Sequence, residues 1–190
     1  MRDKLIKATI ELMNKHGLKF TMDELAAMVH VSKRSLYEEF ASKTVLIEAV
    51  TRYIIGNLDA QEEALMANKD LSLQEKVSAI LTVRPGEVEN FDKDVYEDIR
   101  VSYPEFWKEI EQARNDRLKR LEKIFNDAVE QGIVRKVNIQ ILNKLFVDTL
   151  DIFDSYKFLS SNNLTYKNTV DMVLDIFFHG LLTDKGRRKE

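Results

Sequence analysis

Apolar residues recur every three or four positions along most of this chain, the spacing that places them on one face of an α-helix. Capping residues and helix breakers divide the pattern into about nine predicted helices, with no strand signal. We expect an amphipathic helix at the start, helices beginning at Met22 and after Ser32, and then segments 43–58, 73–84, 92–101, 104–131, 139–158 and 165–182. The predicted fold class is all-α.

Two of the predicted helices are short and joined by a tight turn. Thr21 followed by Glu24 is a capping box, so a helix should begin at Met22. Ser32 caps the next helix, in which Leu36 and Phe40 lie four residues apart and should point inward. This spacing leaves five residues on the outer surface: Lys33, Arg34, Ser35, Tyr37 and Glu38. Cations and hydroxyls on the first turns of such a helix suit a reader of the DNA major groove.

The residues around this helix pair resemble the TetR family of bacterial repressors over about the first fifty residues. The resemblance rests on Leu5, Ala8, Leu12, Met13 and Gly17, then on TMDELA, VSKRSLYEEF, Lys43 and Leu46. It implies that Thr21, Lys33, Tyr37 and Lys43 hold DNA phosphates, while Arg34 and Ser35 approach bases. Ser32, a hydroxyl at the helix N-terminus, completes the predicted DNA-binding set. The implied domains are a three-helix, helix-turn-helix domain at 1–47 and a helical effector-binding and dimerisation domain at 48–190.

This sequence departs from the family pattern at three places. His30 stands where the family usually has glycine, and we interpret it as a turn residue with positive φ rather than a pH sensor or ligand group. Arg34 replaces a small residue, and it either reads guanine or contacts phosphate. Glu38 and Glu39 follow Tyr37 where basic or aromatic residues are common, and they weaken DNA binding unless they face away from it.

The last two long predicted helices are apolar on more than one side, so several partners must bury them. Proteins of the family resemble two-fold dimers joined by these helices, which would carry two reading heads to half-sites about 34–36 Å apart. The alternative is that both helices are central in a monomer. The predicted interface residues are Thr149, Ile152, Tyr156, Val170, Leu174, Phe177 and Leu181.

The body of the chain is rich in aromatic residues, which in the family often line an effector cavity. The predicted pocket residues are Tyr96, Tyr103, Trp107, Phe125, Phe146 and Phe153. Aromatic residues at helical spacing also form ordinary core, and that alternative stays open for each of them. Few cations lie among these residues, which favours an apolar or weakly polar small-molecule effector over a strongly anionic one.

Charge and composition limit the class of protein. The net charge is −3, but residues 1–52 carry +2 and the remainder −5, so the cations gather where DNA should lie. The chain has no cysteine, which excludes disulfides and thiolate metal sites and is compatible with a reducing cytosol. No apolar run is long enough to span a membrane, and the start does not resemble a signal peptide. We expect a cytoplasmic protein without membrane contact.

The sequence offers little for metal binding or catalysis. Asp171, Asp175 and His179 recur every four residues on one helix face, which permits a divalent metal site but is more typical of a solvated polar stripe, so we predict no metal. There is no nucleophilic cysteine, HExxH motif, glycine-rich phosphate loop or nucleophile elbow. We therefore expect neither an enzyme nor a cofactor.

Two functional hypotheses remain. The first is a homodimeric, ligand-responsive transcriptional repressor, in which an effector changes the separation of two DNA-reading heads. The second is a protein-interaction module whose acidic C-terminal part docks a partner and whose DNA-binding head is secondary or vestigial. Activation rather than repression is also open.

Overall fold

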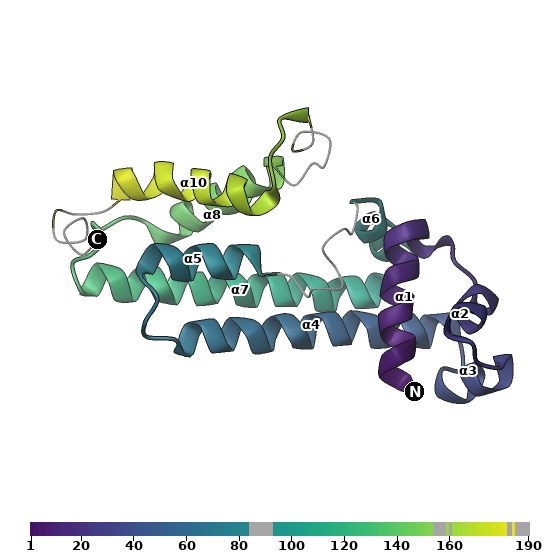
Figure 1. Cartoon of the computed structure of the whole chain (residues 1–190). Helices are drawn as coiled ribbons and strands as arrows, with labels where there is room; N and C mark the ends of the chain where they lie inside the picture. Colours follow the sequence, from purple (N-terminus) through teal and green to yellow (C-terminus); the bar gives the residue numbers. More distant parts are fainter. Residues whose placement is uncertain (84–92, 154–158, 160, 182–183, 185–190) are drawn as a thin grey trace. The chain divides into compact units, whose positions relative to one another are not determined.

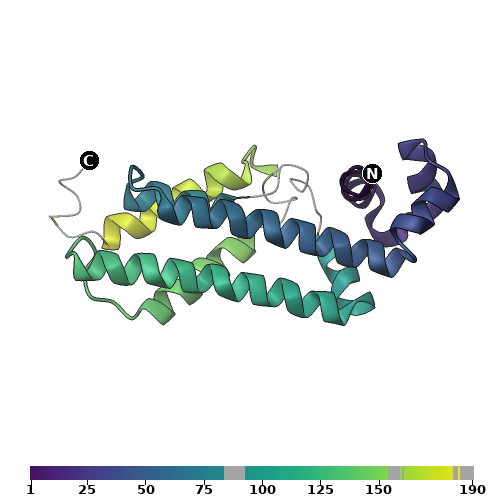
Figure 2. The same ribbon diagram turned by 90° about the horizontal axis from the view of Figure 1, so that it is seen from below.

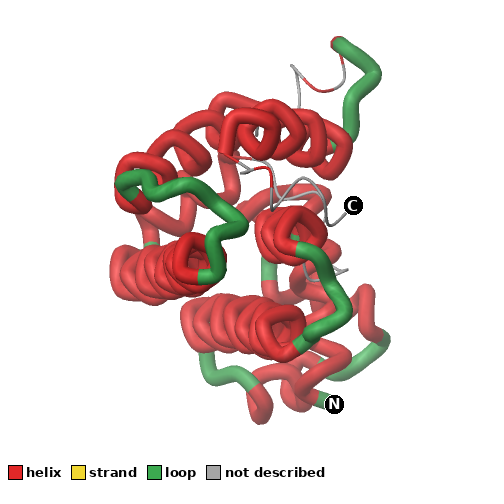
Figure 3. Tube along the Cα trace, turned by 90° about the vertical axis from the view of Figure 1, so that its left-hand side faces the viewer, coloured by secondary structure: helices red, strands yellow, loops and turns green. Residues whose placement is uncertain are grey.

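The computed structural model of the chain describes residues 1–83, 93–153, 159, 161–181 and 184. Over these residues it holds nine α-helices, one 3₁₀ helix and no strand, which confirms the all-α prediction (Figures 1 and 3). The elements are α1 Arg2–His16, η1 Gly17–Lys19, α2 Met22–Val29, α3 Lys33–Glu39, α4 Lys43–Ala67, α5 Leu73–Thr82, α6 Lys93–Ser102, α7 Pro104–Glu130, α8 Ile139–Phe153 and α10 Tyr166–Leu181.

Most helix starts follow from side chains that satisfy the free backbone N–H groups of the first turn. Ser72 with Glu75 forms a second capping box, ahead of α5. Asn138 Oδ1 accepts the N–H of Ile141 at 3.0 Å at the start of α8, and Thr165 Oγ1 accepts that of Asn168 at 3.1 Å before α10. The predicted end of the 73–84 helix at residue 84 and the predicted extension of α8 over 154–158 lie outside the described residues.

The chain packs as two compact units, one of Met1–Ala60 with Arg84–Ala113 and one of Gln61–Val83 with Arg114–Glu190. The helices α4 and α7 each contribute to both units. The boundary between residues 47 and 48 divides the chain by expected function rather than by packing, and it stays a prediction.

The first unit is built around the apolar faces of α1, α2, α3 and the start of α4. Its completely buried side chains include Leu5, Leu25, Leu36, Phe40 and Leu46. From α6, Val95 and Ile99 join the same core. The inward direction of Leu36 and Phe40 is therefore confirmed.

The second unit packs α5 against α10, and α10 against α8 (Figure 1). Three aromatic rings from α7, α8 and α10 form the centre of its core. Phe125 stacks on Phe146 with ring centroids 5.7 Å apart, and on Phe178 at 6.4 Å. All three side chains are almost completely buried.

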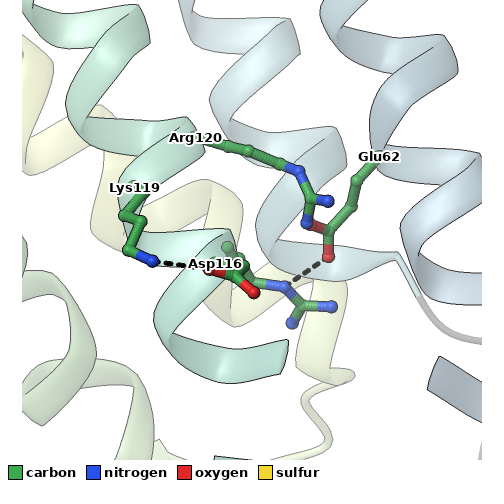
Figure 4. A network of polar contacts seen from close by, with 5 residues as sticks. Glu62, Asp116, Lys119 and Arg120 are labelled. Carbon is green, nitrogen blue, oxygen red and sulfur yellow. Dashed lines mark hydrogen bonds and ion pairs between the residues drawn. The ribbon is translucent and has the colours of Figure 1, made fainter. Parts of the chain in front are cut away.

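A buried ionic cluster joins α4 to α7 within the second unit, where the two helices run side by side in the same direction (Figure 2). Glu62 of α4 is only 2% exposed, and its two carboxylate oxygens accept from different arginines of α7 (Figure 4). Arg117 Nε donates to Oε1 and Arg120 Nη1 donates to Oε2, each at 2.6 Å. Beside them, Lys119 pairs with Asp116 at 2.7 Å. This cluster was not predicted from the sequence.

Candidate nucleic-acid interface

The turn between α2 and α3 is held by its backbone and by residues at both helix ends. The predicted capping box is present, with Thr21 accepting from Glu24 N–H and the Glu24 carboxylate accepting from Thr21 N–H. His30 follows α2 with φ 58° and ψ 45°, the left-handed conformation predicted for it. The N–H of Val31 reaches the carbonyl of Ala26 at 3.0 Å, and that of His30 reaches Ala27 at 3.2 Å, which is the bonding of a Schellman motif.

The outer surface of α3 faces solvent because its inner surface is fully used by the core. Leu36 and Phe40 are completely buried, whereas Tyr37 is 47% exposed. The Arg34 side chain is 89% exposed and that of Lys33 is 67% exposed. The structure therefore presents two cations and a phenol together at one short helix, the arrangement that groove binding needs.

Both cations on this surface pair with a carboxylate of the same unit. Lys33 Nζ lies 2.5 Å from Asp23 Oδ2, which is on α2. Arg34 Nε lies 2.9 Å from Glu38 Oε1, one turn further along α3. Glu38, which the sequence predicts to weaken DNA binding, therefore contacts Arg34, and this pairing was not identified from the sequence.

The predicted hydroxyl contacts take part in capping. Ser32 Oγ accepts the N–H of Ser35 at 3.0 Å, and the two serine hydroxyls lie 2.9 Å apart. Thr21 Oγ1 donates to Glu24 Oε2 at 3.0 Å. The hydrogen bonds from the Thr21 backbone N–H and the Thr21 hydroxyl hold the pKa of Glu24 below its ordinary value, so the capping carboxylate is ionised at neutral pH. Phosphate contacts by these hydroxyls stay a prediction.

Lys43 lies differently from the other predicted DNA contacts. Its ammonium donates to the carbonyls of Leu18 and Phe20, each at 2.5 Å, and lies 4.2 Å from the centroid of the Phe20 ring. Burial lowers the pKa of Lys43, and the nearby Glu24 carboxylate only partly opposes this. Lys43 therefore ties the start of α4 to the segment before α2, and its phosphate contact stays a prediction.

Known proteins share this helix-turn-helix arrangement. A family model described as bacterial regulatory proteins, tetR family, matches residues 5–50, which include α2, α3 and the start of α4. Residues 5–50 thus match the tetR family of bacterial regulatory proteins. The chain's relatives include the uncharacterized HTH-type transcriptional regulator YvaF of Bacillus subtilis (strain 168), which is 22% identical over 185 residues, 97% of each chain.

Solved structures place the rest of the chain in the same fold. KstR2 of Mycobacterium tuberculosis, a ketosteroid transcriptional regulator, has 18% sequence identity and a TM-score of 0.69, covering 96% of this chain and 95% of its own. AibR, in complex with isovaleryl coenzyme A and operator DNA, has 20% identity and a TM-score of 0.65, covering 92% and 96%. The chain is a DNA-binding transcriptional regulator with a tetR-like helix-turn-helix domain and a helical body.

Three of the aromatic residues predicted for an effector pocket belong to the first unit. Tyr96, Tyr103 and Trp107 are partly buried there. Tyr103 stacks on Phe106, with ring centroids 5.4 Å apart, and packs against the core of that unit. A pocket role for these residues stays a prediction.

The other predicted pocket residues belong to the second unit. Phe125 is 0% and Phe146 1% exposed, and the stacking of their rings places them in the packed core. The side chain of Phe153 lies outside the described residues. The predicted pocket residues thus belong to two different units, and their common pocket stays a prediction.

The predicted dimer interface includes residues that the chain buries by itself. Val170 and Leu174 are completely buried in the core of the second unit. Phe177 packs on Phe146, with ring centroids 4.5 Å apart. Thr149 is half-buried. The side chains of the remaining predicted interface residues lie outside the described part: Ile152, Tyr156 and Leu181. Val170 and Leu174 cannot contact a second chain in this structure, because the core of their own unit covers both side chains completely.

A different set of apolar residues on the same helices is exposed. Ile141 and Leu145 of α8 are 60% and 49% exposed, and Met172 and Ile176 of α10 are 56% and 73% exposed. We call these four residues the α8/α10 apolar surface. Each pair has the four-residue spacing of one helix face. That spacing was visible in the sequence, but nothing in it told this face from the one that enters the core.

The polar residues on one face of α10, Asp171, Asp175 and His179, form hydrogen bonds and ion pairs within the second unit. Ser78 donates to Asp171 Oδ1 at 2.5 Å and Lys167 to Oδ2 at 2.6 Å, while His179 Nδ1 lies 3.2 Å from Asp175 Oδ1. Among the described residues, no group of three or more His, Asp or Glu side chains is placed to hold a metal ion. No described helix is both long and apolar enough to cross a lipid bilayer.

Replacing Asp171 with asparagine should lower the melting temperature at pH 7, and the difference from wild type should close in acid. Burial raises the pKa of Asp171, but the hydrogen bonds from Lys167 and Ser78 outweigh it and hold the pKa below its ordinary value. Folding thus favours the ionised carboxylate above about pH 4, and this contribution disappears as the pH falls through the lowered pKa. Thermal melts at pH 7 and pH 3 measure it. Asp175→Asn, at an exposed position one turn further along the same helix, is the control and should change little.

Proposed function

We propose that this TetR-family regulator is a homodimeric repressor that binds an operator through α3 and is released by a small-molecule effector. The observation that carries the proposal is the outward surface of α3, where Lys33, Arg34 and Tyr37 are exposed over the buried Leu36 and Phe40. Such a surface can place base-reading and phosphate-binding groups in one groove. We assign the chain no catalytic role and a cytoplasmic location.

The α8/α10 apolar surface supports the dimer. Four large apolar side chains about half to three-quarters exposed on two neighbouring helices are typical of an interaction surface. Because a two-fold axis brings the same surface from both copies together, one patch suffices for both halves of the interface. The proposed interface therefore rests on Ile141, Leu145, Met172 and Ile176, with Thr149 and Phe177 beside them.

A cleft in the second unit supports the effector. It has a volume of about 1020 Å³ and lies between the end of α4, α5 and the start of α10. Its lining includes the amides of Gln61, Asn68 and Gln74, together with Lys167 and Asp171. These groups favour a polar effector with several hydrogen-bonding groups, in contrast to the apolar effector expected from the aromatic residues. AibR forms a complex with isovaleryl coenzyme A and operator DNA, which supports a small-molecule partner for this chain too.

The DNA flanking the protein's own gene provides the test. Wild type should bind it much more tightly than random duplex of equal length. Lys33→Ala should weaken binding to all sequences alike and reduce the slope of log affinity against log salt by about 2, because each phosphate contact contributes about 0.9 and a dimer makes two. Tyr37→Phe should weaken binding about 10²-fold, because loss of a hydrogen bond to a charged phosphate costs about 1.5 kcal/mol in each of two subunits.

Lys69→Ala is the matched control, since it removes an equal charge from an exposed position in the second unit. It should leave both the affinity and the salt slope unchanged. Wild-type binding no tighter than to random duplex would support the interaction-module hypothesis instead. Small molecules that weaken operator binding by wild type would identify the effector class.

A further inference from the structure

Arg34 and Glu38 form an ion pair on the outward surface of α3, and the nitrogen that makes the contact is Nε of Arg34. Arg34 Nε donates to Glu38 Oε1 at 2.9 Å, so the contact uses the inner edge of the guanidinium. The two side chains are 89% and 63% exposed, which means that no packing holds them. Glu38 is the side chain that Arg34 contacts on this surface.

A guanidinium bound through Nε still has its two terminal nitrogens for a second partner. Arginine carries five N–H donors in a planar fork, and the terminal pair matches the two acceptors O6 and N7 of guanine. An unrestrained arginine on an exposed helix has many rotamers, most of which point elsewhere. A carboxylate on the next turn selects rotamers that keep the fork near the helix surface that enters the groove.

The same carboxylate reduces the attraction of Arg34 for phosphate. Phosphate binding depends mainly on net charge and carries no sequence information, whereas bidentate base contacts depend on direction. Pairing with Glu38 partly cancels the charge of Arg34 but leaves its forward donors in place. The expected result is weaker binding to DNA in general and greater preference for the correct base.

We propose that Glu38 is a specificity-determining positioning residue that directs the Arg34 guanidinium to a guanine in each operator half-site. The inference rests on the proposed operator binding by α3. Glu38 acts through Arg34 and need not touch the DNA itself.

The second ion pair of this surface provides an internal comparison. Lys33 Nζ and Asp23 Oδ2 lie 2.5 Å apart, and both side chains are also largely exposed. A lysine ammonium is a point charge without a fork, so its carboxylate partner cannot direct a bidentate contact. Removing Asp23 should therefore raise the affinity for all sequences without changing the preference among them. This separates positioning from simple loss of negative charge.

The experiment measures binding of the full-length protein to every single-base variant of the operator and to random duplex. Arg34→Ala should lose a guanine preference of about ten-fold or more at one position of each half-site. Glu38→Gln should reduce the same preference, at the same position, to about two- to three-fold and should bind random duplex more tightly than wild type. Asp23→Asn should also bind random duplex more tightly but keep the guanine preference. Glu39→Gln, a neutralisation one residue further along, should keep the preference as well.

Melting temperatures should be equal for wild type and Glu38→Gln, because exposed ion pairs within one helix contribute little to stability. A guanine preference that survives Glu38→Gln but not Arg34→Ala would overturn the inference. A preference lost at a different base pair would also overturn it, since Glu38 would then read a base directly. Absence of any preference in wild type would overturn the proposed function itself, so the two failures can be told apart.

Discussion

Replacing Glu62 with glutamine should lower the free energy of unfolding by about 3–5 kcal/mol. The carboxylate is 2% exposed and accepts hydrogen bonds from Arg117 and Arg120, both at 2.6 Å. The neutral amide would leave two guanidiniums close together and largely out of water without their shared counter-charge. Removing one partner of a buried ionic cluster strongly lowers the free energy of unfolding, because the remaining charges stay buried without a counter-charge. Replacing the whole cluster by apolar residues changes that free energy much less.

Urea unfolding at one fixed protein concentration measures this effect, since any dimer makes the midpoint depend on concentration. Glu63→Gln is the matched control on the same helix, and because Glu63 is exposed it should change the stability by less than about 0.5 kcal/mol. Replacing Glu62, Arg117 and Arg120 together by Leu, Met and Leu should recover most of the loss. A loss below about 1 kcal/mol for Glu62→Gln would mean that water or a neighbouring group replaces the carboxylate.

Replacing Ile176 with glutamate should convert the proposed dimer to a monomer and lower the affinity for the full operator by about 10²–10⁴-fold. Ile176 is the most exposed member of the α8/α10 apolar surface at 73%. Two glutamates would face each other across a two-fold axis in an apolar interface, where unpaired charge is strongly unfavourable. A monomer loses the advantage of binding two linked half-sites, which is the source of this factor.

Sedimentation equilibrium over a range of concentrations gives the oligomeric state, and binding to full operators and to half-sites separates avidity from intrinsic affinity. Half-site affinity should be unchanged, because the substitution lies outside the α3 surface. Val101→Glu is the control, since Val101 is 70% exposed on α6 in the first unit and should leave the dimer intact. The proposed interface would be wrong if Ile176→Glu still formed the wild-type dimer, or if wild type were monomeric at every concentration.

The helices and their starts could be predicted well because their causes are local. The capping boxes at Thr21 and Ser72 and the positive φ of His30 depend on residues within about one helical turn. The outward surface of α3 was also predictable, since Leu36 and Phe40 at four-residue spacing require the opposite face to be exposed. The family resemblance added the expected role of that surface, which periodicity alone does not provide.

The partners of the site residues could not be predicted in the same way. Lys43 bonds to carbonyls of residues 18 and 20, and Lys33 pairs with Asp23, across ten or more positions in the chain. Such contacts depend on how separate elements pack, because long side chains reach whichever neighbour the backbone brings near. The same applies to Glu62, whose arginine partners lie 55 and 58 residues away.

The sequence by itself determined the all-helical fold, most of the helix starts and the face of α3 that meets solvent, whereas α4 continues to Ala67, beyond the segment 43–58 expected for it. Only the tertiary structure decided which of two apolar faces of α10 enters the core, placing Val170 and Leu174 inside and Met172 and Ile176 outside. Helical periodicity groups residues into faces, but burial depends on the neighbouring helices, which the local pattern does not specify.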